Sequence, residues 1–228
     1  MTHPATPSPN EPRNTPCPLC RAADSVYFSR DTSRVYYRCL ICDYVFVPPE
    51  YHLTEHEERA RYDQHQNHPD DPGYRRFLST LADPMLSLLS PGAQGLDFGC
   101  GPGPTLSLLF HEAGFEMDLY DPFYAPHPEV FHRRYDFITA TEVAEHLRDP
   151  AREWKRLFAM LKPGGLLGIM TQMRPEPEAF AAWYYLRDPT HIGFYSHDAC
   201  GWMANQRDAE LLALFGSVAV FRKGVEEF

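Results

Sequence analysis

The chain has 228 residues, which is the length of one full domain with a small appendage. Its hydrophobic fraction of 43% is enough for a globular core. No apolar run approaches the roughly 20 residues that a membrane-spanning helix needs, and the N-terminus lacks the apolar segment of a secretory signal. The formal net charge is −10, whereas nucleic-acid binders usually carry a basic field. We therefore expect a cytoplasmic protein without a membrane span, and the acidic charge favours a small-molecule partner over a nucleic acid.

The first segment, residues 1–16, is expected to be a disordered tail. Five of its sixteen residues are proline and almost none is bulky and apolar. Such a composition cannot bury enough apolar surface to offset the entropy of folding.

Two Cys-x2-Cys pairs, CPLC and CLIC, follow the tail and are separated by 18 residues. This spacing is typical of a structural zinc site, in which four thiolates close a tetrahedron. The stretches SVYFSR and RVYYRC between the pairs alternate as the strands of a hairpin do. The pattern resembles a zinc ribbon over residues 17–47, with Cys17, Cys20, Cys39 and Cys42 as ligands. Two disulfides are the alternative, and a reducing compartment disfavours them.

Residues 48–90 are expected to form a linker and lid helices. Tyr62, His65, Asn67 and Tyr74, within RYDQHQNHPDDPGYRRFL, could cover a bound ligand. The plainer interpretation is a polar helix followed by an Asp-Pro-Gly turn. We favour that interpretation for all but His65, for which the two stand equal.

A strand, a glycine loop and a helix are predicted over GLDFGCGPGPTLSLL. Leu96–Phe98 is apolar, Gly99, Gly101 and Gly103 alternate behind it, and Thr105–Glu112 has a helical pattern. Glycines allow a ligand to approach the backbone closely, and this arrangement is that of a nucleotide-binding α/β unit. The next strand-like stretch ends in Asp121, which could accept hydrogen bonds from both ribose hydroxyls. A turn residue before Pro122 is the alternative.

The spacing Asp-x-Gly-x-Gly-x-Gly, beginning at Asp97, resembles motif I of class I S-adenosylmethionine (SAM) methyltransferases. YDFITATEVAEHL, LKPGGLLGIMTQ and ELLALFGSVAVFRK are similar to that family's fourth strand, fifth strand and antiparallel strand pair. The resemblance implies a Rossmann-like α/β domain over residues 91–228. It implies SAM binding by Asp97, Gly99, Cys100, Gly101, Gly103, Asp121, Pro122 and Thr141.

One departure from the family lies between Asp121 and Tyr135, where only 13 residues intervene. A helix, a third strand and a second helix do not fit in that length. We therefore expect one strand fewer, or a very short strand at Glu129–Phe131, and we assign no adenine contact. Cys100 and Cys200 lack partners at metal spacing and are expected to fill apolar space.

TATEVAEHLRDP places Glu142, Glu145 and His146 on one face if it forms a helix. With His191, these residues resemble the metal site of ubiquinone-pathway and small-RNA O-methyltransferases. The resemblance implies a divalent ion beside the acceptor oxygen. The alternative is a helix cap with a solvated face, in which case His146 or His191 could serve as the general base.

An aromatic run, WYYLRDPTHIGFYS, contains Trp183, Tyr184 and Tyr185. We expect some of these rings to line a planar acceptor site, while a buried insertion packed on the sheet is the alternative. The sequence predicts O-methylation of a small or medium-sized molecule with a SAM cofactor, a structural Zn²⁺ and a possible second cation. An RNA methyltransferase and a SAM-binding scaffold without turnover are the alternatives.

Overall fold

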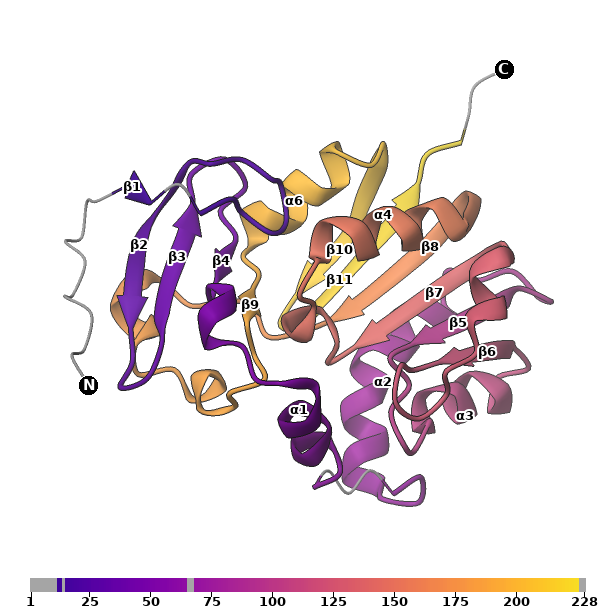
Figure 1. Ribbon diagram of the computed structural model, residues 1–228. Helices are drawn as coiled ribbons and strands as arrows, with labels where there is room; N and C mark the ends of the chain where they lie inside the picture. Colours follow the sequence, from indigo (N-terminus) through magenta and orange to yellow (C-terminus); the bar gives the residue numbers. More distant parts are fainter. Residues whose placement is uncertain (1–11, 14, 65–67, 226–228) are drawn as a thin grey trace.

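The central sheet of the computed structural model, which describes residues 12–13, 15–64 and 68–225, has six strands (Figure 1). The strands in spatial order are β10 (Ala209–Phe215), β11 (Val218–Lys223), β8 (Leu161–Met170), β7 (Tyr135–Thr141), β5 (Gln94–Phe98) and β6 (Glu116–Tyr120). The last four run parallel, and β11 and β10 are antiparallel. The predicted α/β fold class is confirmed.

The segments predicted around the glycine loop form as expected. β5 contains the predicted strand at Leu96–Phe98, and α3 (Thr105–Glu112) coincides with the predicted helix. Four of the five β5 residues are buried, as a parallel strand covered on both faces requires. The C-terminal hairpin of β10 and β11 matches the predicted antiparallel pair.

The shortened segment between β6 and β7 contains a 3-10 helix, η2 (Pro128–His132), in place of a strand. The prediction of one strand fewer is confirmed, and the alternative of a short strand at Glu129–Phe131 is wrong. Pro128 lacks the amide proton of a sheet ladder and suits the start of a helix. Phe131 instead packs edge-on against the Tyr120 ring, with centroids 4.5 Å apart.

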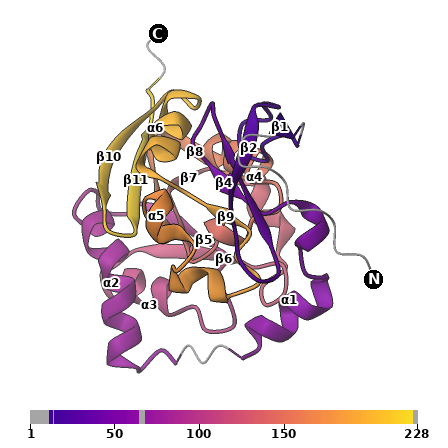
Figure 2. The ribbon, with the colours of Figure 1, turned by 90° about the vertical axis from the view of Figure 1, so that its left-hand side faces the viewer.

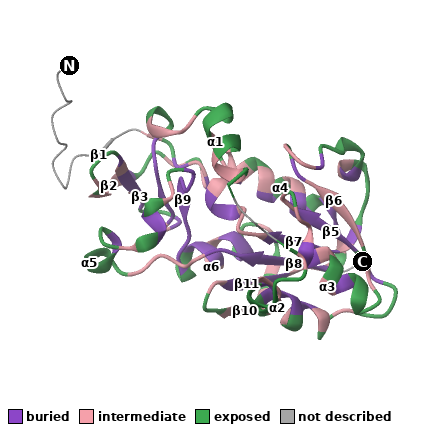
Figure 3. Cartoon of the chain, turned by 90° about the horizontal axis from the view of Figure 1, so that it is seen from below, coloured by how far each residue is buried: buried purple, intermediate pink, exposed green. Residues whose placement is uncertain are grey.

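Helices cover both faces of the sheet. α2 (Pro72–Leu86) and α3 pack on one face through a core that includes Leu81, Phe110 and Phe137. α4 (Pro150–Met160) and α6 (His197–Asn205) cover the other face, where Trp154 is fully buried. Figure 3 shows the buried residues gathered on the strands between these layers. Within the described residues, no helix combines the length and apolar character that crossing a membrane requires.

The second sheet contains the two cysteine pairs. Its strands, in spatial order, are β1 (Pro12–Arg13), β2 (Ser25–Arg30), β3 (Val35–Cys39), β4 (Val45–Phe46) and β9 (Gly193–Phe194). The predicted hairpin is present as β2 and β3. β9, from more than 140 residues away in the sequence, pairs with β4 (Figure 2). Most of the predicted tail, 1–11 and 14, lies outside the described residues, but Pro12–Arg13 pairs with β2, which the prediction of disorder did not include.

The ribbon and the central sheet share one hydrophobic core. Tyr44 of the ribbon packs edge-on against Tyr195, with ring centroids 4.8 Å apart. Tyr195 Oη in turn accepts a hydrogen bond from Trp154 Nε1 of α4 at 2.9 Å. Asp43, beside the second cysteine pair, accepts hydrogen bonds from Arg174 and from the Ser196 hydroxyl that caps α6. The ribbon is therefore packed against the helices of the larger domain.

The linker after the ribbon contains η1 (Pro49–Tyr51), α1 (Glu55–Tyr62) and the start of α2. The predicted Asp-Pro-Gly turn is wrong, because Asp71 instead caps α2 by accepting the amide protons of Gly73 and Tyr74. Aspartate at the N-cap and proline at the next position are both favoured at a helix start. Two further short helices, α5 (Pro177–Phe180) and η4 (Tyr184–Arg187), lie between β8 and β9.

Candidate active site

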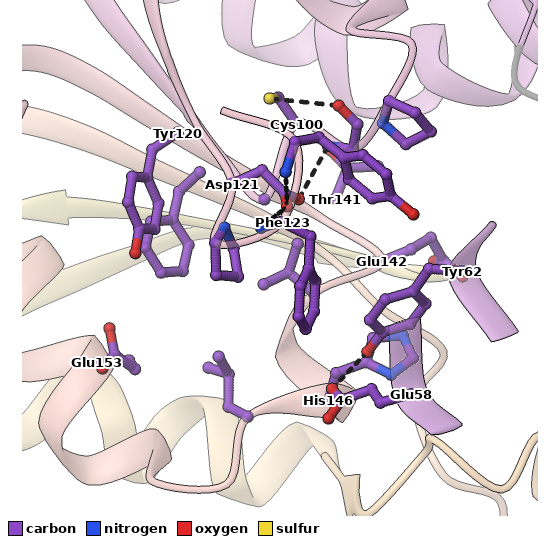
Figure 4. A pocket seen from close by; sticks show the side chains of 18 of the residues that line it. Glu58, Tyr62, Cys100, Tyr120, Asp121, Phe123, Thr141, Glu142, His146 and Glu153 are labelled. Atoms are coloured by element: carbon purple, nitrogen blue, oxygen red, sulfur yellow. Dashed lines mark hydrogen bonds between the residues drawn. The ribbon is translucent and has the colours of Figure 1, made fainter. Parts of the chain in front are cut away.

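A cavity of about 800 Å³ opens at the carboxyl ends of β5, β6 and β7. Ligands of open α/β sheets bind at this edge. Figure 4 shows Tyr62 and His146 at one end of the cavity and Tyr120 and Glu153 at the other, with Asp121 and Phe123 between them. The lining residues come from the glycine loop, the ends of β6 and β7, and helices α1, α2 and α4.

The glycine loop forms one wall of this cavity. Gly99 has a φ of +80°, and a Cβ at this position would lie 2.2 Å from Val143 Cγ2. Gly101 has a φ of +64° with open space beside it. The amides of Gly99 and Cys100 donate to the Tyr120 carbonyl at 2.7 and 3.1 Å, which holds the loop against the end of β6. A side chain at position 99 would therefore both strain the backbone and collide with the neighbouring loop.

Asp121 joins this loop to the turn after β6. Its Oδ2 accepts the Gly101 amide at 3.1 Å, and its Oδ1 accepts the amides of Phe123 and Tyr124 at 2.8 and 3.1 Å. The carboxylate lies on the cavity wall, so the turn role that the sequence left open coexists with a position suited to a ligand. A carboxylate oxygen has two lone pairs, so Oδ1 is fully engaged by its two amides and Oδ2 keeps acceptor capacity.

Nine of the twelve predicted cofactor and Glu/His residues line the cavity: Gly99, Cys100, Gly101, Asp121, Pro122, Thr141, Glu142, His146 and His191. Glu145 is fully buried beside them. Asp97 and Gly103 are not on its wall. Asp97 is buried behind the loop and accepts a hydrogen bond from Thr139 Oγ1 at 3.1 Å. Burial raises the pKa of Asp97 to about 7, and the charge of Asp121 adds to the effect.

The segment after β7 does not form the α-helix that would have placed Glu142, Glu145 and His146 on one face. Glu142 has a φ of +52°, in the left-handed region, and a 3-10 helix, η3 (Ala144–His146), follows. The Glu142 amide donates to the Met170 carbonyl at 2.8 Å, which continues the ladder to β8 for one more residue. Glu142 still pairs with β8, and only a tight turn follows it. Glu142 therefore does not lie on a helical face with Glu145 and His146.

Three of the four predicted Glu/His ligands come together nonetheless. The donor atoms of Glu145, His146 and His191 all lie within 4.8 Å of one another, whereas Glu142 lies outside this group. His191 Nδ1 is 2.8 Å from the Tyr185 carbonyl, and His146 Nδ1 is 3.1 Å from the Thr190 carbonyl. Because a carbonyl oxygen only accepts, each Nδ1 carries a proton, and in the neutral imidazole Nε2 is then the nitrogen with the lone pair.

The carboxylates beside these histidines are short of partners. Glu145 is fully buried, and its Oε1 accepts a hydrogen bond from Tyr185 Oη. Glu145 Oε2, Glu142 Oε1 and Thr141 Oγ1 are buried and have no hydrogen-bond partner. Burial and the charge of Glu145 raise the pKa of Glu142 to about 9, and burial likewise raises the pKa of Glu145. Buried oxygens of this kind fit a cation, which would satisfy them and favour their charged forms.

The cysteine cluster has the geometry of a different kind of site. Cys17 and Cys42 have sulfurs 3.6 Å apart, and those of Cys20 and Cys39 are 3.4 Å apart. All four sulfurs lie within 4.8 Å of one another. A tetrahedron of thiolates around zinc has edges of about 3.8 Å, whereas a disulfide has its sulfurs about 2.05 Å apart. The spacing fits a metal and not the disulfide alternative.

Most of the aromatic run packs in the interior, in line with the alternative of an insertion, and Trp183, Tyr184 and Tyr185 are not among the residues that line the cavity. Tyr185 packs on the His191 ring with centroids 4.0 Å apart, and Trp183 packs against the ribbon sheet. Tyr184 is 57% exposed. Sequence reasoning missed the bond between Tyr185 and Glu145, because the two residues are 40 positions apart and only the fold brings them together.

The lid segment contributes more than the sequence favoured. Tyr62 and Tyr74 both line the cavity, and Tyr62 packs edge-on against His146 with ring centroids 5.3 Å apart. His65 and Asn67 lie outside the described residues. Cys200 is buried in α6, as expected, but Cys100 faces the cavity.

Comparison with known proteins decides the family. A family profile described as "Methyltransferase domain" matches residues 62–214, about two thirds of the chain. The chain belongs to this methyltransferase family. The match covers the glycine loop, Asp121 and the Glu/His cluster, and it confirms the predicted relationship to class I SAM-dependent methyltransferases. The cysteine ribbon lies outside the matched residues.

Curated relatives include two ubiquinone biosynthesis O-methyltransferases. The protein from Shewanella pealeana is 26% identical over 141 residues, which is 60% of this chain and 58% of the relative. The protein from Serratia proteamaculans is 33% identical over 81 residues, or 35% of this chain and 34% of the relative. The methyltransferase thus spans between about a third and three fifths of the length of these relatives.

A solved structure shares the fold. The magnesium protoporphyrin IX methyltransferase from Synechocystis, solved with bound S-adenosylhomocysteine (SAH), has a TM-score of 0.50 and 11% identity. The alignment covers 76% of this chain and 96% of that one. At this identity the likeness concerns the fold of the methyltransferase and not its substrate.

Proposed function

We propose that the protein transfers the methyl group of SAM to an oxygen of a small or medium-sized molecule, with a divalent cation beside the acceptor. One observation carries this proposal. Buried carboxylate oxygens without partners lie beside two histidines whose Nδ1 atoms are bonded to backbone carbonyls, and this cluster borders the same cavity as the glycine loop.

SAM would be held by the backbone of the loop, which Gly99 and Gly101 keep open, and by Asp121 at its ribose. Cys100, Pro122 and Thr141 line the same space. Asp97 would act indirectly, from behind the loop, together with the turn at Gly103. The SAM methyl group is the electrophile, and the enzyme's task is to align an oxygen nucleophile behind it.

The cation would be held by Glu145, His146 and His191, with Glu142 next to them. Mixed carboxylate and imidazole donors suit Mg²⁺, Mn²⁺, Fe²⁺ or Zn²⁺. When bound, a cation lowers the pKa of an acceptor hydroxyl and fixes its direction. The chain's own part is to fix both Nδ1–H groups on carbonyls, hold Glu145 through Tyr185, and close the pocket with Tyr62.

Structural zinc at Cys17, Cys20, Cys39 and Cys42 completes the proposal. A four-thiolate site has no open coordination position, so its role is to hold the ribbon together. We further propose four segments: a tail (1–16), the ribbon (17–47), the linker and lid (48–90) and the SAM-binding domain (91–228). β9 belongs to the last of these segments by sequence, but it pairs with β4 of the ribbon sheet.

A small-molecule acceptor is favoured over RNA by the net charge of −10. The curated relatives act in ubiquinone biosynthesis by their names, which supports an O-methyl acceptor for this chain as well. An RNA methyltransferase and a scaffold without turnover remain outcomes of the test below.

The test is a titration followed by an assay. Calorimetry with SAH should give one binding site, and Asp121→Ala should weaken it without unfolding the protein. Methyl release should then be measured on phenols, catechols and structured RNA, with Mg²⁺ or Mn²⁺ added or removed. Metal-dependent release with a hydroxyl compound supports the proposal. Release only with RNA, or binding without release, supports one of the alternatives.

A further inference from the structure

A buried arginine of the ribbon contacts the segment that carries His191. The Arg34 side chain is only 6% exposed. Its Nη1 donates to the His191 carbonyl at 3.0 Å and to the carbonyls of Asp188 and Pro189 at 3.4 Å each. Its Nη2 donates to the Leu186 carbonyl. One guanidinium therefore bonds four carbonyls within a single six-residue stretch.

The charge of this guanidinium is balanced within the ribbon itself. Arg34 Nε lies 3.3 Å from Asp31 Oδ2. Asp31 also accepts the Tyr36 hydroxyl and, at 2.7 Å each, the amides of Ser33 and Arg34. A planar fork of five donors suits several fixed acceptors at once, which a lysine ammonium on a flexible stem does not.

The segment that Arg34 holds also orients the Glu/His cluster. The Thr190 carbonyl accepts the proton of His146 Nδ1, and the Tyr185 carbonyl accepts that of His191 Nδ1. The Ile192 amide donates to the Glu145 carbonyl at 2.8 Å. All three cluster residues therefore depend on the position of residues 185–192.

The ribbon supports this segment at a second point. The Val47 amide donates to the Ile192 carbonyl at 2.9 Å, and the β4–β9 pairing begins one residue later, with Phe46 opposite Gly193. From the other side, Arg61 of α1 forms an ion pair with Asp188 at 2.9 Å.

We propose that Arg34 is a positioning residue, through which the ribbon holds residues 185–192 so that His146, His191 and Glu145 converge. The proposal rests on the Glu/His metal site of the proposed function, and it gives the ribbon a role in that site. Arg34 itself contacts neither cofactor nor acceptor.

The first experiment measures amide hydrogen exchange of residues 184–196 in Arg34→Met and in Arg30→Met. Arg30 is an exposed arginine of the same hairpin and serves as the matched control. Exchange should be at least tenfold faster in Arg34→Met and unchanged in Arg30→Met. Equal protection in wild type and Arg34→Met overturns the proposal. If Arg34→Met does not retain its zinc, Arg34→Lys takes its place.

The second experiment titrates the same proteins with Mn²⁺, after their content of ribbon zinc has been verified. Loss of an outer support typically weakens metal affinity roughly 10- to 100-fold, and we expect that loss in Arg34→Met, a smaller one in Arg34→Lys and none in Arg30→Met. The rate constant kcat should fall while the affinity for SAH stays unchanged. Unchanged Mn²⁺ affinity in Arg34→Met contradicts the positioning role. Absence of Mn²⁺ binding in the wild type would instead contradict the proposed metal site. In that case, the hydrogen-exchange experiment alone tests the positioning role of Arg34.

Discussion

The cysteine cluster of the ribbon and the Glu/His cluster of the cavity differ in their donors and in their access to solvent. Three of the four cysteines are fully or almost fully buried, in a core shared with α4 and α6, and none lines the cavity. Glu142, His146 and His191 line the cavity, with Glu145 buried behind them. The comparison separates a closed sulfur site, suited to stability, from an open oxygen and nitrogen site, suited to chemistry.

The two clusters are also physically connected. Residues 185–192 lie between them, bonded to Arg34 and Val47 of the ribbon on one side and to Glu145 and His146 on the other. The ribbon therefore forms part of the structure that supports the cavity. Loss of the cysteine site should also disturb the Glu/His cluster.

The largest effect is expected from Cys39→Ser, which removes a buried ligand of the closed site. Structural zinc binds with an apparent energy of about 10–16 kcal/mol when its ligands are all present. Cys39→Ser removes one of the four sulfurs, so zinc should be lost. Because Cys39 and Trp154 belong to the same core, near-ultraviolet circular dichroism and thermal unfolding should both show damage to the larger domain. A variant without zinc that unfolds at the wild-type temperature would show that the ribbon contributes little to that core.

Substitution of the loop glycines tests the cavity wall. Gly99→Ala combines a positive φ with a collision against Val143 and should cost about 3 kcal/mol of stability, together with most of the affinity for SAH. Gly101→Ala, which has the strain without the collision, should cost about 1–2 kcal/mol. Gly92→Ala, with a φ of +81° in open space away from the cavity, is the control for strain alone. Equal SAH affinity in all three variants would contradict the role of the loop.

Asp97 is buried as Glu145 is, but it lies behind the glycine loop and not on the cavity wall. Its pKa is raised from 3.8 to about 7, so its protonated form is favoured in the folded state. The stability that this provides is complete below about pH 4 and is lost as the pH rises through 7. Asp97→Asn should remove about 3 kcal/mol of this pH dependence, with or without added divalent metal, in urea unfolding between pH 5 and 8. A wild-type slope that persists in the variant would exclude Asp97 as its source.

The smallest effect is expected at the edge of the ribbon. Arg21 and Asp149 form an exposed ion pair between the ribbon and α4, and exposed pairs contribute less than about 1 kcal/mol. Arg21→Ala should therefore change the thermal midpoint only slightly, whereas Asp43→Ala, which leaves Arg174 unpaired, should change it several-fold more. Equal shifts would mean that the buried attachment does not hold the ribbon in place.

The sequence predicted what depends on short-range pattern. The two Cys-x2-Cys pairs, the glycine loop with α3, and the strand ending at Asp121 are each encoded by a short stretch of sequence, and all appear in the structure. The missing strand was also predictable, because 13 residues cannot span the usual elements.

Long-range contacts account for what the sequence could not predict. The spacing of Glu142 and Glu145 suggested a helix, but the bond from Glu142 to Met170 extends the sheet ladder and forces a tight turn. The bonds of Arg34 to the His191 segment join residues more than 150 positions apart. No local pattern marks an arginine for such a contact, since its acceptors are backbone carbonyls that every residue possesses.

The central claim is that the open cluster binds a cation that methyl transfer requires. Its most direct test is equilibrium dialysis against Mn²⁺ after mild chelation, with elemental analysis and methyl release measured on the same samples of wild type, Glu145→Gln and His191→Ala. All three proteins should keep one zinc, and only the wild type should bind one Mn²⁺ tightly and gain activity from it. Equal Mn²⁺ binding in the three proteins, or full wild-type activity without any divalent cation beyond the ribbon zinc, would contradict the claim.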